Sequence, residues 1–183
     1  ATAIGRSANA VGQYSIALGF LSNASDGEAI AMGGNANATS TKSIALGYNA
    51  QSIKSDTIAI GHSVMSNGTN STAIGRDANA AKDDSIAIGY NAHANGTNSA
   101  AIGRNANASH TNSIALGHGA TTNSANQIML GTSITHVIPA GTFQVPYFVA
   151  DFEEEKKLTP DPSATGDLFG NSSSVSGDTV LVG

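Results

Sequence analysis

The residues best suited to binding recur in one column of a periodic sequence. Cationic and aromatic side chains directly follow regularly spaced glycines: Arg6, Phe20, Tyr48, His62, Arg76, Tyr90, Arg104 and His118. Arginine and aromatic residues are enriched at the centres of binding interfaces. We therefore predict that this column forms an adhesive stripe if it points outward. The alternative interpretation is structural: these side chains cover strand corners and bridge to Asp or Asn of neighbouring coils.

The same search indicates no enzyme and no metal protein. The chain has no cysteine, which excludes thiolate metal sites and cysteine nucleophiles. It has no nucleophile elbow, phosphate-binding loop or His-Glu-x-x-His motif. His62 and His118 share a column but lie four repeats apart, too far for one metal ion. We predict no catalytic residue, no metal site and no cofactor.

A strict repeat must position the stripe. Glycines recur every 14 residues, at Gly5, Gly19, Gly33, Gly47, Gly61, Gly75, Gly89, Gly103, Gly117 and Gly131. Before each glycine the common unit is Ser-Ile-Ala-Ile/Leu, and after it Ala alternates with polar residues, often Asn. Alternation with period two predicts strands. Each repeat thus predicts two short strands and two turns, which form one coil of a parallel β-solenoid. Ten coils would make a rod of about 45 Å.

The strand before each glycine is apolar on both faces, because aliphatic residues alternate with alanine. One face can fill the coil, and the other needs a second surface to cover it. Self-association of identical chains with cyclic symmetry supplies that surface economically. The pattern does not distinguish two chains from three, or tell which face is the interface. The alternative is a monomeric solenoid with an exposed alanine face.

The repeats resemble the heads of YadA-like trimeric autotransporter adhesins. The resemblance rests on Ser-Ile-Ala-Leu-Gly-Tyr-Asn-Ala at 43–50, Ser-Ile-Ala-Ile-Gly-Tyr-Asn-Ala at 85–92 and their copies, and it covers residues 1–131. It implies an all-β, left-handed parallel β-roll that assembles as a homotrimer. It also implies an extracellular adhesin, anchored in the outer membrane through the parent chain. Such a protein attaches to a host, prey or matrix surface through a surface protein or glycan, without catalysis.

Departures from that family leave a second function open. No heptad pattern follows Gly131, although heads of this family continue into a coiled-coil stalk. The module also resembles segments of phage, viral and bacterial trimeric fibres. The alternative function is therefore a structural spacer of a bacterial or virion fibre whose C-terminal tip binds the receptor. An ice-binding solenoid is disfavoured, because the regular hydroxyl column is mostly Ser and no parallel Thr column accompanies it.

Residues 132–183 carry no repeat, and we expect a second domain there. Its aromatic residues predict a small β-rich cap or tip, formed by Phe143, Tyr147, Phe148 and Phe152. An open solenoid end normally needs such a cap. Residues 159–178 are rich in Gly, Ser and Pro, which predicts a flexible segment. Residues 179–183 predict a final strand.

The distribution of charge limits the classes of partner that the chain can bind. Residues 1–131 hold six basic and six acidic side chains, whereas residues 132–183 hold two basic and seven acidic ones, so the net charge of −5 lies in the tail. A neutral body with an acidic tail argues against binding nucleic acid. No apolar stretch approaches the ~18 residues that a membrane-spanning helix needs. We therefore expect no direct insertion of this segment into a membrane.

Overall fold

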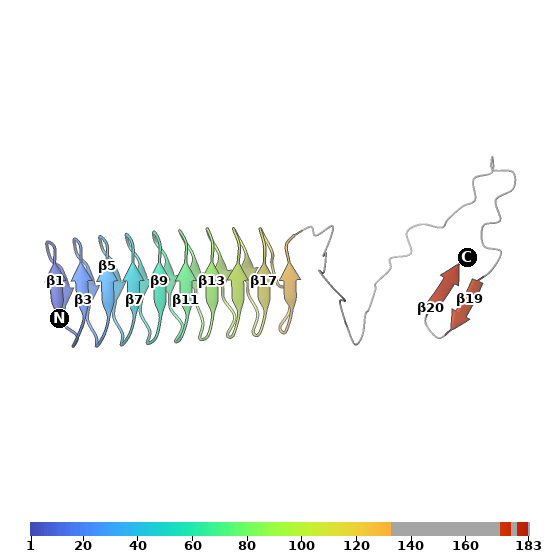
Figure 1. Ribbon diagram of the computed structural model, residues 1–183, viewed down its shortest axis with the longest axis horizontal. Coiled ribbons are helices and arrows are strands. Elements are labelled where there is room, and N and C mark those ends of the chain that lie inside the picture. Colours follow the sequence, from blue (N-terminus) through green and yellow to red (C-terminus); the bar gives the residue numbers. More distant parts are fainter. Residues whose placement is uncertain (133–172, 177–178, 183) are drawn as a thin grey trace, which may run out of the picture. The chain divides into compact units, whose positions relative to one another are not determined.

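The computed structural model describes residues 1–132, 173–176 and 179–182. Residues 1–132 form a stack of flat coils, most of which contribute one strand to each of two facing parallel sheets (Figure 1). The predicted parallel β-solenoid of 14-residue coils is confirmed. The left-handed winding stays a prediction from the family resemblance.

The first sheet has ten strands, which are paired in chain order. They are β1 (Thr2–Ile4), β3 (Ile16–Leu18), β5 (Ile30–Met32), β7 (Ile44–Leu46), β9 (Ile58–Ile60), β11 (Thr72–Ile74), β13 (Ile86–Ile88), β15 (Ala100–Ile102), β17 (Ile114–Leu116) and β18 (Ile128–Leu130).

The second sheet has eight strands of two residues each. They are β2 (Asn9–Ala10), β4 (Asn23–Ala24), β6 (Asn37–Ala38), β8 (Gln51–Ser52), β10 (Met65–Ser66), β12 (Asn79–Ala80), β14 (His93–Ala94) and β16 (Asn107–Ala108). A single bridge between Asn107 and Thr121 extends this sheet by one coil.

The register follows from the repeat. Each strand pairs with the strand one coil further on, so that Ala87 lies beside Ala101 and Ile88 beside Ile102. Residues 14 apart in the chain are therefore neighbours in space, about 4.8 Å apart as in any β-ladder. Every column of the sequence becomes a row of side chains along the rod.

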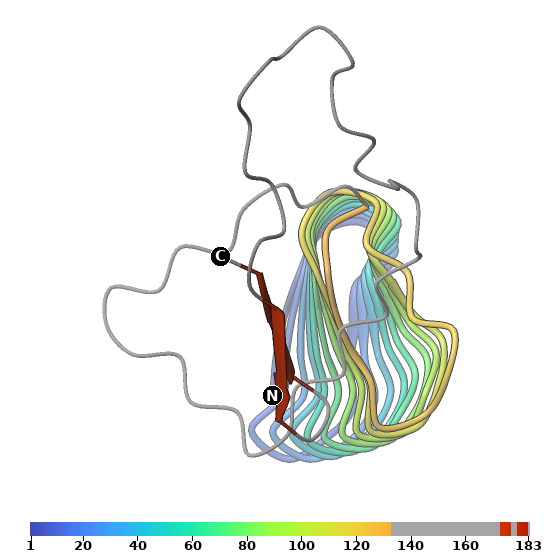
Figure 2. The same ribbon diagram turned by 90° about the vertical axis from the view of Figure 1, so that its right-hand side faces the viewer.

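The interior of the rod is built almost entirely from alanine. The central residue of nearly every strand in the first sheet is a fully buried alanine, for example Ala87, and the second sheet contributes Ala92 and Ala94. Because these side chains are so small, the two sheets lie close together in the end-on view (Figure 2). This packing decides which apolar face points inward. The sequence left open which face is the interface. Of the alternative monomeric solenoid, the exposed alanine face is contradicted, because alanine fills the coil of a single chain and the larger aliphatic residues point outward.

The glycine column occupies the turn after each strand of the first sheet. Gly19 has a φ of 132°, and a Cβ atom built on it would lie 2.6 Å from the carbonyl oxygen of Gly33 in the next coil. Both the backbone angle and the close approach of two coils therefore require glycine. Further residues of the turns lie in the left-handed region, and eleven of these seventeen non-glycine positions are Asn or Asp, which tolerate that conformation best.

Asparagine ladders join successive coils, because asparagine recurs at the same position of several repeats and stacked amides can hydrogen-bond along the column. Asn23 accepts a hydrogen bond from Asn9 at 2.8 Å and donates one to Asn37 at 2.9 Å. A second ladder joins Asn35 to Asn49 at 3.0 Å. These bonds connect residues 14 apart, so they reinforce the stacking of coils rather than the shape of one coil.

The second compact unit spans residues 138–183. Its described part is an antiparallel pair, β19 (Ser173–Ser176) and β20 (Thr179–Val182). β20 matches the predicted final strand. β19 lies within residues 159–178, which we expected to form a flexible segment. Its serine-rich composition hid a strand that pairs with the apolar β20.

Other predictions for this unit lie outside the described residues. They concern the cap or tip residues Phe143, Tyr147, Phe148 and Phe152. The domain boundary after residue 131 also stays a prediction. Among the described residues, no helix is long and apolar enough to cross a membrane.

Candidate binding surface

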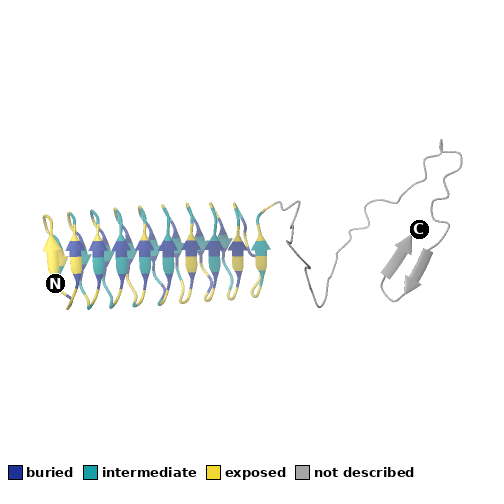
Figure 3. Cartoon of the chain, in the orientation of Figure 1, coloured by how far each residue is buried: buried dark blue, intermediate teal, exposed yellow. Residues whose placement is uncertain are grey.

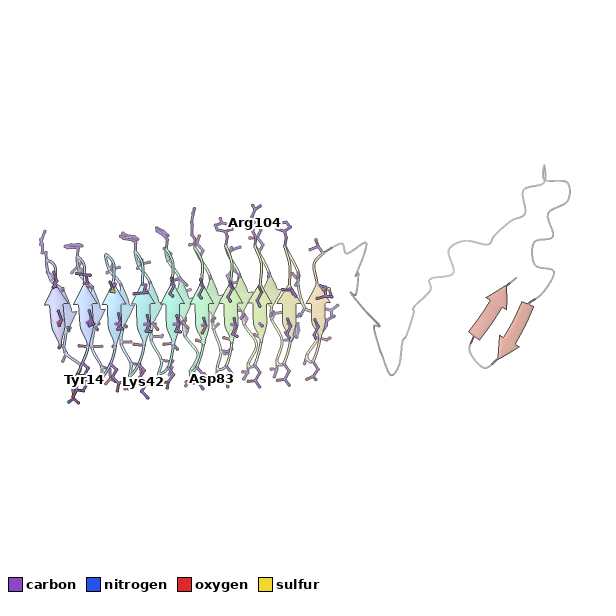
Figure 4. The ribbon with its side chains drawn as sticks, viewed as in Figure 1. Tyr14, Lys42, Asp83 and Arg104 are labelled. Atoms are coloured by element: carbon purple, nitrogen blue, oxygen red, sulfur yellow. The ribbon has the colours of Figure 1, made fainter. Side chains whose placement is uncertain are left out.

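The corner stripe consists of Arg6, Phe20, Tyr48, His62, Arg76, Tyr90, Arg104 and His118. Each of these residues lies in the turn that leads from the first sheet to the second, and all eight are exposed. The rings are the most accessible aromatic surfaces at this corner, with 50% of Phe20, 61% of Tyr48 and 44% of Tyr90 exposed. Arg104 marks this corner in Figure 4. The stripe therefore points outward along the rod.

Neighbouring members of the stripe stack on one another. The guanidinium carbon of Arg76 lies 5.5 Å from the ring centroid of Tyr90, and that of Arg104 lies 5.9 Å from the same ring. Arg6 lies 5.5 Å from the ring centroid of Phe20. These are cation–π distances. Under the structural interpretation, these side chains would bridge to Asp or Asn of neighbouring coils. Arg76 instead forms an ion pair with Asp77 of its own coil, at 3.1 Å.

A third stack forms around Tyr48. Its ring lies 5.4 Å from the ring of His62, centroid to centroid, with an interplanar angle of 24°. On its other side the column holds Gly34, and a Cβ atom there would lie 3.3 Å from the Tyr48 ring. Glycine thus leaves room for the ring and interrupts the stripe. The sequence analysis did not identify which members of the stripe stack on one another. The signal that could have found them is that each arginine lies 14 residues, or one coil, from an aromatic residue.

The opposite corner of the rod has a different chemistry. The turns that lead back to the first sheet carry Tyr14, Lys42 and Asp83 (Figure 4). All charged residues of this corner are exposed: Asp26, Glu28, Lys42, Lys54, Asp56, Lys82, Asp83 and Asp84. Five acids and three lysines give it a net charge of −2, whereas three arginines and Asp77 give the stripe corner +2. The two corners are therefore oppositely charged.

The aliphatic face is the outward surface of the first sheet. Its members are the first and third residues of each strand: Thr2, Ile4, Ile16, Leu18, Ile30, Met32, Ile44, Leu46, Ile58, Ile60, Thr72, Ile74, Ile86, Ile88, Ala100, Ile102, Ile114, Leu116, Ile128 and Leu130. None of the twenty is buried in the single chain, and seventeen are Ile, Leu or Met. Figure 3 shows the buried band of alanine between exposed or half-exposed strand ends. A continuous apolar surface of this kind marks an interaction site.

The described residues offer contact chemistry at this surface. Among them, no group of three His, Asp or Glu side chains lies close enough to hold a metal ion. The stripe instead presents guanidinium groups and exposed aromatic rings, which are residue types enriched at binding interfaces.

Comparisons with known proteins bear on both units. A model of the YadA head domain repeat matches residues 1–22, 23–50, 66–92 and 94–120, together more than half of the chain. A model of the FG-GAP repeat matches residues 152–183. No curated protein gives a significant match.

Four solved chains match. One is the collagen-binding domain of the Yersinia adhesin YadA, which is 26% identical to this chain and has a TM-score of 0.49. The match covers 84% of this chain and 82% of that one.

Proposed function

The chain belongs to the family of YadA head domain repeats, and from this premise we propose that it is the head of a cell-surface adhesin that works as a homotrimer. It attaches a cell to a host, prey or matrix surface by contact and catalyses no reaction. The aliphatic face carries the proposal. A row of Ile and Leu along the whole rod is costly to expose to water, and a second or third copy of the same chain presents a matching row.

Three copies suit this face because of its position. It covers one side of a flat coil, and both corners beside it carry charged side chains. A closed ring of three such faces buries every aliphatic row around one axis and leaves the second sheets outward. Cyclic symmetry also prevents the open-ended growth that a non-closing contact would produce.

Attachment is tested with the full chain coupled to beads. The beads are applied under flow to cultured host cells and to collagen, the ligand of the similar Yersinia domain. We expect retention that uncoated beads lack. A useful control is Ile88→Asp, which places a charge on the aliphatic face and weakens attachment by reducing the number of linked heads. Retention equal to that of uncoated beads on every surface would contradict an adhesin.

A second candidate function is a structural spacer whose C-terminal unit binds the receptor. The match of residues 152–183 to a different repeat family favours it. Deleting residues 138–183, with circular dichroism to confirm that the solenoid stays folded, separates the two functions. An adhesive solenoid keeps part of the bead retention after this deletion, whereas a spacer loses all of it.

A further inference from the structure

The three arginines of residues 1–132 all lie in the corner stripe, and the three lysines all lie at the opposite corner. Arginine presents a planar fork of donors that matches carboxylate and sulfate groups, and it stacks on aromatic rings. Lysine has no such fork and stacks less well on aromatic rings. The segregation therefore places the anion-binding chemistry of the solenoid along one edge.

The stacks leave these arginines available to a ligand. A guanidinium held over a ring face is ordered by that contact, and among the described residues only Arg76 also donates a side-chain hydrogen bond, from its Nε to Asp77 at 3.1 Å. Within residues 1–132 the one ion pair joins Arg76 to Asp77, so Arg6 and Arg104 have no acidic partner among the described residues. All three arginines are exposed.

The geometry favours a linear and sparsely charged partner. Arg76 and Arg104 are two coils apart, which is about 9.6 Å along the rod at the usual strand spacing. Tyr90 lies between them with 44% of its surface exposed. Two cations with the exposed edge of an aromatic ring between them suit a polymer whose anionic groups are separated by uncharged sugar units. Duplex DNA carries a charge every ~1.7 Å, far denser than the stripe.

We propose that the corner stripe binds an acidic polysaccharide that lies along the rod. Carboxylate or sulfate groups of the polymer accept hydrogen bonds from Arg76 and Arg104, and the sugar between them passes over the exposed edge of Tyr90, whose ring lies between the two guanidinium groups. This inference rests on the proposed function, since it names the class of ligand that the adhesin recognises. The acidic opposite corner repels the same polymer, which confines binding to the stripe.

The experiment measures binding of the full chain to three immobilised polysaccharides: heparin, which carries sulfate and carboxylate, hyaluronan, which carries carboxylate alone, and neutral dextran. We expect binding to heparin, to hyaluronan or to both, weakening as salt rises, and none to dextran. Binding to heparin alone assigns sulfate as the recognised group, and equal binding to both assigns carboxylate.

Two double variants with the same change of charge provide the decisive comparison. Arg76→Ala with Arg104→Ala should weaken binding at least about tenfold, the equivalent of ~1.4 kcal/mol. Lys54→Ala with Lys82→Ala removes the same charge from the opposite corner and should change binding less than about twofold. Tyr90→Ala removes the ring without changing the charge, and we expect an intermediate loss.

Several outcomes would overturn the proposal. They are equal losses in the two double variants, equal binding to dextran, and equally strong binding to duplex DNA. A fall in oligomeric mass in the arginine variant alone would place these arginines between copies of the chain and would also refute it. Beads that adhere to cells equally well before and after enzymatic removal of acidic polysaccharides would refute it too, while leaving the adhesin function intact.

Discussion

Ala87 and Ile88 are neighbours in β13, yet Ala87 is fully buried inside the coil while 37% of Ile88 faces outward. The same division recurs along the first sheet. A thin core of alanine stabilises a single coil weakly, because each side chain removes little apolar surface from water. The larger aliphatic surface stays available for association. In this protein we therefore expect folding and assembly to be linked through one strand.

The first prediction tests the aliphatic face with a matched pair of substitutions. Ile88→Asp should dissociate the assembly, because it would bury an unpaired carboxylate between copies. Ile53→Asp is the control, since Ile53 is 38% exposed but lies outside the aliphatic face. Light scattering should show a lower mass for the first variant only. Identical masses for the two variants would contradict the assigned interface.

The second prediction concerns the thickness of the core. Ala87→Leu inserts three carbon atoms where the two sheets lie close together, and overpacking of this kind costs roughly 1–3 kcal/mol or more. Ile88→Leu in the same strand keeps its volume and points outward, so we expect little change in the unfolding temperature. Thermal unfolding followed by circular dichroism measures both. An Ala87→Leu variant as stable as the parent would show that the interior is looser than the structure indicates.

The third prediction distinguishes two glycines. Gly19→Ala should destabilise the rod by at least ~2 kcal/mol, since the new Cβ would lie 2.6 Å from the Gly33 oxygen and φ is 132°. Gly27→Ala should be tolerated, because the nearest atom to its Cβ is the Gln13 oxygen at 4.0 Å. Chemical denaturation of the two variants gives the comparison. Equal stability would be inconsistent with the close approach of successive coils at the glycine column.

The fourth prediction is a stabilising change. Leu21 has a φ of 55° and precedes the ladder of Asn35 and Asn49 by one coil. Leu21→Asn should raise the free energy of unfolding by about 1 kcal/mol, because asparagine tolerates the left-handed region and can extend the ladder. The reverse change, Asn49→Leu, should lower it by a similar amount. A Leu21→Asn variant less stable than the parent would show that packing of the exposed leucine matters more than backbone strain.

Much of the solenoid was predictable because each column repeats one residue type. The glycines at intervals of 14 predict the coil, and the columns of Asn23 and Asn35 predict the ladders that form. The direction of the faces was not predictable, since Ala and Ile are both apolar and alternation alone does not say which is inside. Steric fit decides it: only the smaller residue fits between sheets joined by such short turns.

The binding surface was only partly predictable. The sequence places Arg76, Tyr90 and Arg104 in one column and thus along one edge, but it does not say whether they contact acids or one another. Those contacts depend on the side-chain conformations of residues in neighbouring coils, and a periodic pattern of residue types does not determine these conformations. β19 escaped prediction for a related reason, because its serines pair through the backbone with β20 and carry no apolar alternation.

The measurement that tests the central claim most directly is the absolute mass of the unmodified chain in solution, by light scattering coupled to size exclusion. A homotrimer that buries its aliphatic face has a mass of 54.6 kDa, three times the chain mass of 18.2 kDa. We expect that value across a wide range of concentrations. A mass of 18.2 kDa would leave the rows of Ile and Leu exposed in water and would contradict the account of an adhesin head that works as an assembly.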